Sequence, residues 1–310
     1  MNEPELASWR PGTTRTRIEA FLEAVQEVAP AQRLAVLDND GTLWCERPTY
    51  VQYDFFADAL GRAAADDPAL GERPELRAVL DGDGAAIAEI GLPRVAGALA
   101  ELFDGMEAAE FTARTREFVA RATHPLLGRP TTGLVYRPML ELLDALRARD
   151  VTVCIVTGGG TEFVRAISDD LYGVPPERVV GTMIRYRYER EAGRPVLRRT
   201  AELDGPANEG AAKVEAMARH LGRSPLLAAG NSVGDREMLD VAAGASPGLA
   251  LLVVHDDDER EIAYESVAGT IADAEPLADV ATRSGWTTVS MRDDWTTVFA
   301  DPIELGRTTP

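Results

Sequence analysis

The chain has 310 residues, of which 45% are hydrophobic and 27% are charged, a composition typical of folded globular proteins rather than of disordered or fibrous ones. The length predicts about two domains, or one large domain that carries an insertion. Because 51 acidic residues outnumber 32 basic ones, giving a formal net charge of −19, we expect no sequence-independent binding to nucleic acid or to an anionic membrane.

No segment has the pattern of a targeting signal or a membrane span. The longest uninterrupted apolar run covers residues 249–254, far below the roughly 18 residues that a membrane helix requires. The N-terminal segment has early acidic residues and no continuous apolar stretch, so we expect a cytoplasmic protein. Its two cysteines, Cys45 and Cys154, could form at most one bridge, and we expect both to be reduced.

The first third of the chain predicts one helix, one strand and then a helical insertion. An amphipathic helix is expected over residues 16–29, and the pattern RLAVL at 33–37 is typical of a strand buried on both faces of a parallel sheet. The loop DNDGTLWCERP follows. Residues 49–127 contain three helical stretches separated by proline and glycine and no convincing strand pattern, which predicts a helical insertion.

Alternating strand and helix signals resume after the insertion. The expected elements are a helix at 138–150, a strand at 151–156, a helix at 161–170, a strand and hairpin within 178–200 turning at Ala192-Gly193, a helix at 209–221, a strand at 225–229, a helix at 235–242 and a strand at 249–254. Several βα units in succession predict an α/β fold with a doubly wound, Rossmann-like parallel sheet. Residues 1–48 and 128–310 would form this core.

Ligands of such sheets bind beyond the carboxyl ends of the strands, and two groups of polar residues stand there in the first half of the chain. Asp38 and Asp40 follow the first strand with Asn39 between them, and two close carboxylates favour a hard cation such as Mg²⁺. Thr157 follows the second strand, and together with Gly158 and two more glycines before a helix it offers a hydroxyl and exposed amides to an anion.

Two further groups come from the second half of the chain. The segment GNSVGD after the strand at 225–229 offers Asn231 and Asp235, which could complete a metal site. Lys213, in the preceding helix, is the only lysine among the 32 basic residues. A compact ammonium differs from the planar fork of arginine, so the lone lysine indicates a role that arginine cannot fill.

Taken in order, a hydrophobic strand with DNDGT, a strand ending in threonine, a lone lysine and GNSVGD resemble the haloacid dehalogenase superfamily of phosphohydrolases, with the spacing of its phosphoserine-phosphatase-like branch. The resemblance implies that residues 49–127 are a helical cap over a small-molecule site. It also implies Mg²⁺-dependent hydrolysis of a phosphomonoester, with Asp38 as the nucleophile that forms an aspartyl-phosphate and Asp40 as the general acid and base.

The same resemblance assigns the remaining site residues. It places Asn39, Thr157, Gly158 and Lys213 at the phosphoryl group, and Asp38, the carbonyl of Asp40, Asn231 and Asp235 at the metal. The chain departs from the family pattern at Asn231, where most relatives have an acidic residue, so we expect weakened or differently arranged Mg²⁺ binding. The presence of Asp40 argues against a dehalogenase, and the absence of lysine from residues 49–127 argues against a phosphonate hydrolase.

Two other classes of function stay open. The string Gly230–Gly234 satisfies G-x-S-x-G, so Ser232 could be the nucleophile of a serine hydrolase, although His255 is then the only histidine downstream of it. A non-catalytic phosphate-ligand binding protein on the same fold is the second alternative. The substrate and the oligomeric state are not indicated by the sequence.

Several residues near these motifs have less certain roles. Glu46 and Arg47 are either substrate-sensing residues, as their distance from Asp38 in related phosphatases implies, or a solvated ion pair. His255 follows a predicted strand and is expected to be structural. The string HDDDERE at 255–261 predicts the start of a solvated helix, and Trp286 and Trp295 are expected to pack against the core.

Overall fold

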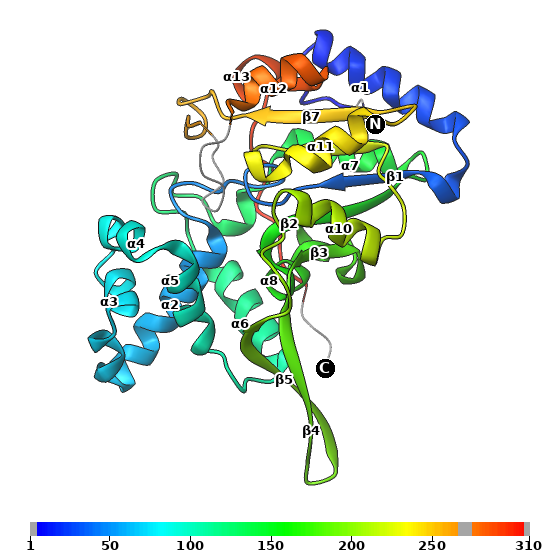
Figure 1. The fold of residues 1–310 in the computed structure, drawn as a ribbon. Coiled ribbons are helices and arrows are strands. Elements are labelled where there is room, and N and C mark those ends of the chain that lie inside the picture. Colours follow the sequence, from blue (N-terminus) through cyan, green and yellow to red (C-terminus); the bar gives the residue numbers. More distant parts are fainter. Residues whose placement is uncertain (1–4, 266–274, 307–310) are drawn as a thin grey trace.

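The computed structural model describes residues 5–265 and 275–306 (Figure 1). Its centre is a six-stranded sheet in the order β3-β2-β1-β6-β7-β8, with every neighbouring pair parallel. The strands are β1 (Leu34–Leu37), β2 (Thr152–Gly160), β3 (Val179–Thr182), β6 (Leu227–Gly230), β7 (Leu249–Val254) and β8 (Thr287–Ser290). Because β1 lies in the middle and later strands add on both sides of it, the predicted doubly wound sheet is confirmed.

Helices cover both faces of this sheet. They are α1 (Thr13–Ala24), α7 (Arg137–Arg147), α8 (Thr161–Arg165), α9 (Ser168–Tyr172), α10 (Ala211–His220), α11 (Arg236–Ala243), α12 (Leu277–Ser284) and α13 (Met291–Asp294). Short 3-10 turns occupy Val25–Glu27, Pro30–Gln32, Pro68–Glu72, Thr131–Gly133, Pro176–Arg178 and Val233–Asp235.

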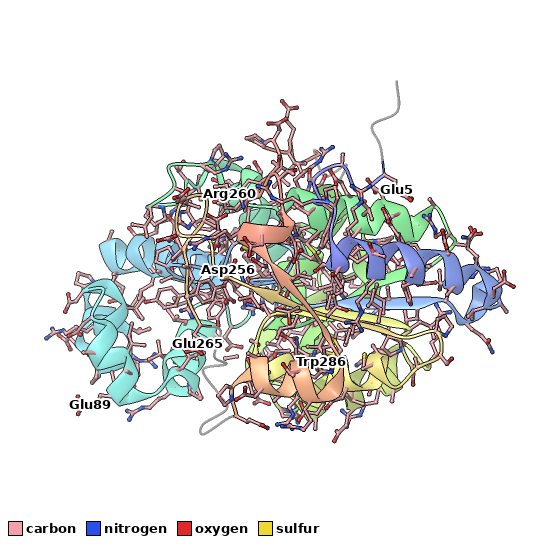
Figure 2. The ribbon with its side chains drawn as sticks, turned by 90° about the horizontal axis from the view of Figure 1, so that it is seen from above. Glu5, Glu89, Asp256, Arg260, Glu265 and Trp286 are labelled. Carbon is pink, nitrogen blue, oxygen red and sulfur yellow. The ribbon has the colours of Figure 1, made fainter. Side chains whose placement is uncertain are left out.

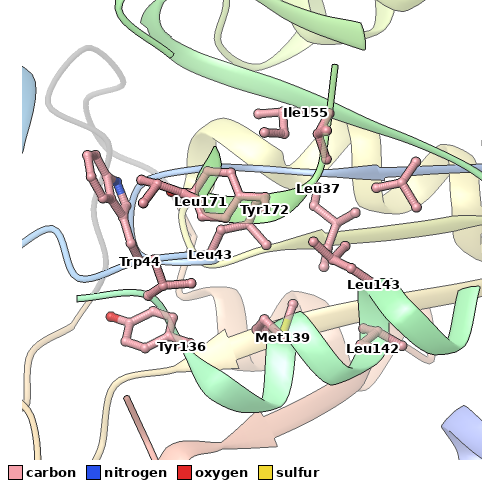
Figure 3. Close-up of a cluster of buried hydrophobic side chains, with 14 of the residues drawn as sticks. Leu37, Leu43, Trp44, Tyr136, Met139, Leu142, Leu143, Ile155, Leu171 and Tyr172 are labelled. Carbon is pink, nitrogen blue, oxygen red and sulfur yellow. The ribbon is translucent and has the colours of Figure 1, made fainter. Parts of the chain in front are cut away.

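The alternation of side chains along β1 divides the core into two apolar clusters. Ala35 and Leu37 point into the cluster that holds α1 and α7, whereas Leu34 and Val36 point into the one that holds α10, α11 and α12. Figure 3 shows Leu37 of β1 among the side chains of α7 in the first cluster. Burial on both faces explains why the strand reads as a continuous apolar run.

The segment between β1 and β2 is helical, as its sequence pattern predicts. Its helices are α2 (Val51–Asp66), α3 (Pro74–Leu80), α4 (Gly84–Ile90), α5 (Leu92–Glu101) and α6 (Ala108–Arg121). Prolines in the first turns of α3 and α5 and the Asp83 side chain at the N-terminus of α4 start these helices. The insertion has its own apolar cluster, made of Leu60, Leu76, Val79, Val95, Ala98 and Leu99. In Figure 1 it lies to one side of the sheet.

The predicted hairpin is confirmed as β4 (Ile184–Glu191) and β5 (Arg194–Leu203), an antiparallel pair that projects from the body of the molecule in Figure 1. Ala192 and Gly193, both with positive φ, form its two-residue turn. The hairpin contacts the helical insertion, since Gly105 N donates to the carbonyl of Arg199 and Arg199 N donates to Met106, each at 3.0 Å. This contact joins a part of the expected core to the insertion.

Two expected elements end or break at other residues, and one strand was not predicted. Strand β2 continues through the glycines to Gly160 instead of ending at residue 156, because its end pairs with Thr182 of β3 after a register shift. The helix expected at 161–170 is broken at Ile167 into α8 and α9. Strand β8 was not expected at all, because its alternation of exposed and buried residues is only four residues long.

The segment after β7 is a loop rather than a solvated helix start. Arg260 ties this loop to the end of the chain by donating to the carbonyls of Met291 at 2.7 Å and Trp295 at 3.0 Å. Figure 2 shows Asp256, Arg260 and Glu265 along it. The expected burial of Trp286 and Trp295 is confirmed.

Two expectations concern the chain as a whole. Cys45 and Cys154 are both free thiols and both buried. Within residues 5–265 and 275–306, no helix is long and apolar enough to cross a membrane.

Candidate active site

The predicted site residues meet at one edge of the sheet. Strands β2, β1 and β6 are neighbours and parallel, so Thr157, Asp38 and Asn231 all lie at their carboxyl ends. Asp38 N donates to the carbonyl of Ala229 at 2.9 Å, which extends the pairing of β1 with β6 to the first site residue. The parallel sheet therefore brings together motifs that are far apart in the sequence.

The loop after β1 turns tightly around Asn39 and Gly41. The carbonyl of Asn39 accepts from Leu43 N at 2.8 Å, and the Asn39 side chain is fully buried. Gly41 has φ +71°, and a Cβ at this position would lie 2.0 Å from Nδ2 of Asn231. Glycine is required here because both the backbone conformation and the close approach of Asn231 exclude a side chain.

Lys213 forms the centre of the site. Its Nζ donates to Oδ1 of Asp38 at 2.8 Å, to Oδ1 of Asp235 at 2.6 Å and to the carbonyl of Val156 at 2.9 Å, and the side chain is only 2% exposed. Burial lowers the pKa of Lys213, but the two carboxylates outweigh it and raise the pKa above its usual value. The lysine therefore stays an ammonium.

Asp38 is buried with this ammonium. Burial and the negative charge of Asp235 raise the pKa of Asp38, whereas the charge and hydrogen bond of Lys213 oppose the shift. The three groups form one charge cluster with two carboxylates and one cation. Such a cluster attracts a further cation.

The second oxygen of Asp235 organises the GNSVGD segment. Oδ2 accepts from Asn231 N at 3.0 Å and from Ser232 N at 2.9 Å. A Cβ at Gly230 would lie 2.5 Å from the Asp235 side chain, so glycine is needed for this closure. Both oxygens of Asp235 are thus engaged with Lys213 and the backbone, an arrangement that positions the loop.

The Asp40 carboxyl lies beside the glycine segment that follows Thr157. Its Oδ1 accepts from Trp44 Nε1 at 2.9 Å. Burial raises the pKa of Asp40, and this hydrogen bond only partly opposes the shift. Thr157 Oγ1 accepts from Gly159 N at 3.0 Å, and a Cβ on Gly159 would lie 3.4 Å from both Thr157 Oγ1 and Asp40 Oδ2. The Asp40 carboxyl and the Thr157 hydroxyl therefore line the same space.

Sequence reasoning missed two residues that shape the glycine segment. Asn208 Nδ2 donates to the carbonyl of Thr157 at 2.9 Å, which anchors the end of β2 from the loop before α10. Gln52 of α2 accepts from Gly160 N at 2.8 Å and reaches this edge from the helical insertion. Neither residue belongs to a motif, and no local pattern distinguishes them from surface amides.

Asn231, where the family pattern has an acidic residue, lies beside a buried carboxylate. Its Nδ2 donates to Oε1 of Glu46 at 3.1 Å, and the hydroxyl of Tyr264 donates to the same oxygen at 2.7 Å. Burial raises the pKa of Glu46, against the effect of the Tyr264 bond. The guanidinium of Arg47 lies 4.4 Å from the centre of the Tyr264 ring. Glu46 is therefore a buried residue, and the solvated ion pair is the wrong alternative.

His255 supports the loop after β1, in line with the structural role expected for it. Its Nε2 donates to the carbonyl of Gly41 at 2.8 Å, and its Nδ1 lies 3.3 Å from Oε2 of Glu261. Oε1 of Glu261 accepts from the Tyr136 hydroxyl and the Cys45 thiol, both at 3.0 Å. Burial alone would raise the pKa of Glu261, but the hydrogen bonds and charge of its partners lower it below the usual value.

The serine-hydrolase arrangement is not formed. Ser232 Oγ donates to Oδ2 of Asp235 at 3.2 Å and accepts from Gly234 N at 3.2 Å, as in a helix-capping turn. Both ring nitrogens of His255 are turned toward Gly41 and Glu261 instead. Within the part of the chain that the structure describes, Ser232 thus has no histidine beside it to act as the base of a nucleophilic serine.

The donor atoms at this edge fit a magnesium ion by their chemistry. Among the described residues no group of three or more His, Cys, Asp or Glu side chains is arranged to hold a metal. Mg²⁺ needs only one or two protein carboxylates when water and a substrate phosphate complete its octahedron. The Asp38 carboxylate, the Asp40 carbonyl and the Asn231 amide oxygen are oxygen donors of this kind.

These features define an α/β protein with a carboxylate and ammonium centre at the switch point of a doubly wound sheet. Residues 35–240 match the family model of the haloacid dehalogenase-like hydrolases, and the chain belongs to this family. The predicted resemblance to that superfamily is therefore confirmed. A search of curated protein sequences finds no match.

Solved structures resemble the fold at low sequence identity. A protein of unknown function from Bordetella pertussis Tohama I is 19% identical, with 83% of this chain and 98% of that chain covered and a TM-score of 0.51. A functionally unknown protein from Anaerococcus prevotii DSM 20548 is 13% identical, with 91% and 92% covered and a TM-score of 0.56. A phosphoserine phosphohydrolase-like protein from Francisella tularensis subsp. tularensis SCHU S4 is 15% identical, with 81% and 99% covered and a TM-score of 0.40. The first two likenesses bear on the fold alone.

Proposed function

We propose that the protein is a phosphatase that hydrolyses a small-molecule phosphomonoester with the help of Mg²⁺. The observation that carries this proposal is the placement of Asp38 against Lys213, with Asp40 bonded to Trp44 and lying beside Thr157 at Gly159. The two aspartates stand two residues apart in sequence yet have different surroundings. This difference suits them to different steps of one reaction.

In the first step, Asp38 acts as the nucleophile. Its carboxylate oxygen attacks phosphorus in line, the phosphorus–oxygen bond of the ester breaks, and Asp40 gives its proton to the leaving alkoxide. Burial raises the pKa of Asp40, which is the direction that suits a general acid. Lys213, the hydroxyl of Thr157 and the N–H of Gly158 bind the phosphoryl oxygens, with Asn39 predicted to assist.

In the second step, the aspartyl-phosphate on Asp38 is hydrolysed. Asp40, now a carboxylate, takes a proton from a water molecule, and the resulting oxygen attacks phosphorus. The bond between phosphorus and Asp38 breaks, inorganic phosphate leaves, and both aspartates return to their starting states. The helical insertion is proposed to act as a cap that limits the access of bulk water to this step.

The metal would be held by Asp38, the carbonyl of Asp40 and Asn231. When bound, Mg²⁺ offsets negative charge on the phosphoryl oxygens. The family resemblance also predicts Asp235 as a ligand. Its bonds to Lys213 and to two backbone amides favour instead a role in positioning Asn231. Because Asn231 is neutral, we expect weaker Mg²⁺ binding than an acidic residue would give.

The experiment is phosphate release from a panel of small phosphomonoesters, with Mg²⁺ and with EDTA. Wild type, Asp38→Asn and the surface control Asp104→Asn are compared side by side. We expect release that requires metal, a loss of at least a thousandfold in Asp38→Asn, and no change in the control. Turnover near wild type in Asp38→Asn contradicts the mechanism. Binding of inorganic phosphate without release from any ester favours the non-catalytic alternative.

A further inference from the structure

Gln52 is a residue of the helical insertion whose side chain lies in the strand-end site. It is the second residue of α2, and its Oε1 accepts from Gly160 N at 2.8 Å although the two residues are 108 positions apart in the sequence. Gly160 ends β2, directly after the segment that contains Thr157. One hydrogen bond thus joins the first turn of the insertion to the proposed phosphate-binding segment.

The space around Gly159 shows how near Gln52 lies to the reacting groups. A Cβ on Gly159 would lie 3.3 Å from Gln52 Oε1 and 3.4 Å from both Asp40 Oδ2 and Thr157 Oγ1. The three oxygens therefore surround one point. A Cβ on Gly160 would lie 2.6 Å from Gln52 Nε2, so a side chain there would displace the amide. Gly159 and Gly160 therefore leave space for the Gln52 side chain, because neither has a side chain of its own.

The orientation of the Gln52 amide follows from its partner. A backbone N–H can only donate, so the Gln52 atom that bonds to Gly160 N must be the amide oxygen. The other terminal atom of the side chain is then the amide nitrogen, Nε2. No hydrogen bond joins Nε2 to any residue in the described ranges 5–265 and 275–306. Its two N–H groups lie beside Gly160, next to the space that Oε1 lines with Asp40 and Thr157, and are available to a ligand there.

We propose that Gln52 is a specificity-determining residue for the proposed phosphatase reaction and selects esters whose alcohol carries a second oxygen on the carbon next to the ester carbon. The bond to Gly160 holds the amide plane, and Nε2 donates to that second oxygen, a hydroxyl or carboxylate. The inference rests on the proposed function, because it concerns the alcohol portion of the substrate. A fixed donor that is left without an acceptor in the complex raises the free energy of that complex. A substrate that lacks the acceptor is therefore strongly disfavoured.

A pair of substrates that differ in the acceptor isolates this contact. Glycerol 3-phosphate carries the second oxygen and propyl phosphate does not. We measure kcat/KM for both esters in wild type, Gln52→Ala, Gln52→Met and the control Gln26→Ala, whose residue lies in the turn after α1 and bonds to the Leu22 carbonyl. Wild type and control should prefer glycerol 3-phosphate by about tenfold, and in both Gln52 variants the ratio of the two kcat/KM values should fall to about one.

A second measurement needs no turnover. Hydrogen exchange of the Gly160 amide should accelerate about tenfold in Gln52→Ala, because its acceptor is gone, and stay near wild type in Gln52→Glu, whose carboxylate still accepts. Exchange of the other amides of the sheet, which should stay at the wild-type rate, verifies that each variant is folded.

The outcomes separate the inference from the proposed function. An unchanged substrate preference in both Gln52→Ala and Gln52→Met overturns the specificity role even when all the enzymes are active. Unchanged exchange of the Gly160 amide in Gln52→Ala overturns the contact itself. If wild type hydrolyses neither these esters nor any member of the wider panel, the proposed function fails and the specificity role falls with it, while exchange at Gly160 still decides the contact.

Discussion

The sheet core and the helical insertion differ in how firmly they hold their side chains. All four residues of β1 are fully buried, whereas α2 buries three of its sixteen residues and α4 buries none. The insertion instead carries surface ion pairs such as Arg73 with Glu101. Groups that must keep a fixed geometry for chemistry lie on the core, where packing over-determines them. The insertion reaches the site through Gln52, whose Oε1 accepts from Gly160 N at 2.8 Å, and this is the residue that we propose selects substrates.

Replacement of Lys213 should have the largest effect. Lys213→Met leaves the buried carboxylates of Asp38 and Asp235 without their cation, which costs about 3–5 kcal/mol of stability. Lys213→Arg keeps the charge, but the planar guanidinium is too large for a site that holds a compact ammonium. We therefore expect at least about a hundredfold loss of kcat. Denaturant unfolding and phosphate release measure the two effects. An arginine variant within threefold of wild type would disprove the special role of the lysine.

Equal truncations in the two regions test the contrast in packing. Leu37→Ala in β1 and Leu99→Ala in α5 remove the same atoms from buried positions, and such changes cost about 2–5 kcal/mol. We expect the core variant near the upper end, with loss of the whole fold, and the insertion variant near the lower end. Hydrogen exchange in Leu99→Ala should rise in α2–α6 and leave the sheet unchanged. Equal loosening of both regions by Leu99→Ala would show that they form one cooperative unit.

Replacement of Glu261 tests the buried hydrogen bonds that hold the residues next to the site. Glu261→Gln removes a carboxylate that accepts from Tyr136 and Cys45, and we expect a loss of about 2 kcal/mol at pH 7. The folded pKa of Glu261 lies below its usual value of 4.5, so its stabilisation is present above that pH and is lost as the pH falls through the folded pKa. Thermal unfolding from pH 7 to pH 3 should show the variant and wild type converging. A constant difference across this range contradicts the linkage.

The smallest effect is expected from an ion pair on the insertion. Arg73 and Glu101 have side chains 40% and 53% exposed, and exposed pairs contribute less than about 1 kcal/mol. Glu101→Gln should change the free energy of unfolding by less than about 0.5 kcal/mol, and salt should reduce even that. A loss above 1 kcal/mol in denaturant unfolding would mean that the insertion depends on surface charge more than its packing indicates.

The sequence predicted the elements and residues whose signals are local. Strand β7 begins and ends at the expected residues, because a strand buried on both faces leaves an uninterrupted apolar run. Lys213, which the sequence singles out as the only lysine, lies buried between Asp38 and Asp235. The insertion is helical as expected, because its proline and glycine breaks are also local signals.

Failures of prediction occur where distant partners decide. The string HDDDERE has the charge pattern of a solvated helix, yet its last residue, Glu261, is buried against Cys45 and Tyr136. Glycines after residue 156 indicated a loop, but pairing with β3 keeps that segment extended as far as Gly160. In each case tertiary contacts outweighed local propensity.

By itself the sequence determined the class of fold, the order of the strand-end motifs and the residue types available for chemistry, since each is encoded within a few neighbouring residues. Only the tertiary structure decided which amides and carboxylates contact these strand-end motifs. Gln52 meets Gly160 across 108 residues, Asn208 meets Thr157 across 51, and Cys45 meets Glu261 across 216. Contacts at such separations depend on how the whole sheet is assembled, and no local periodicity records them.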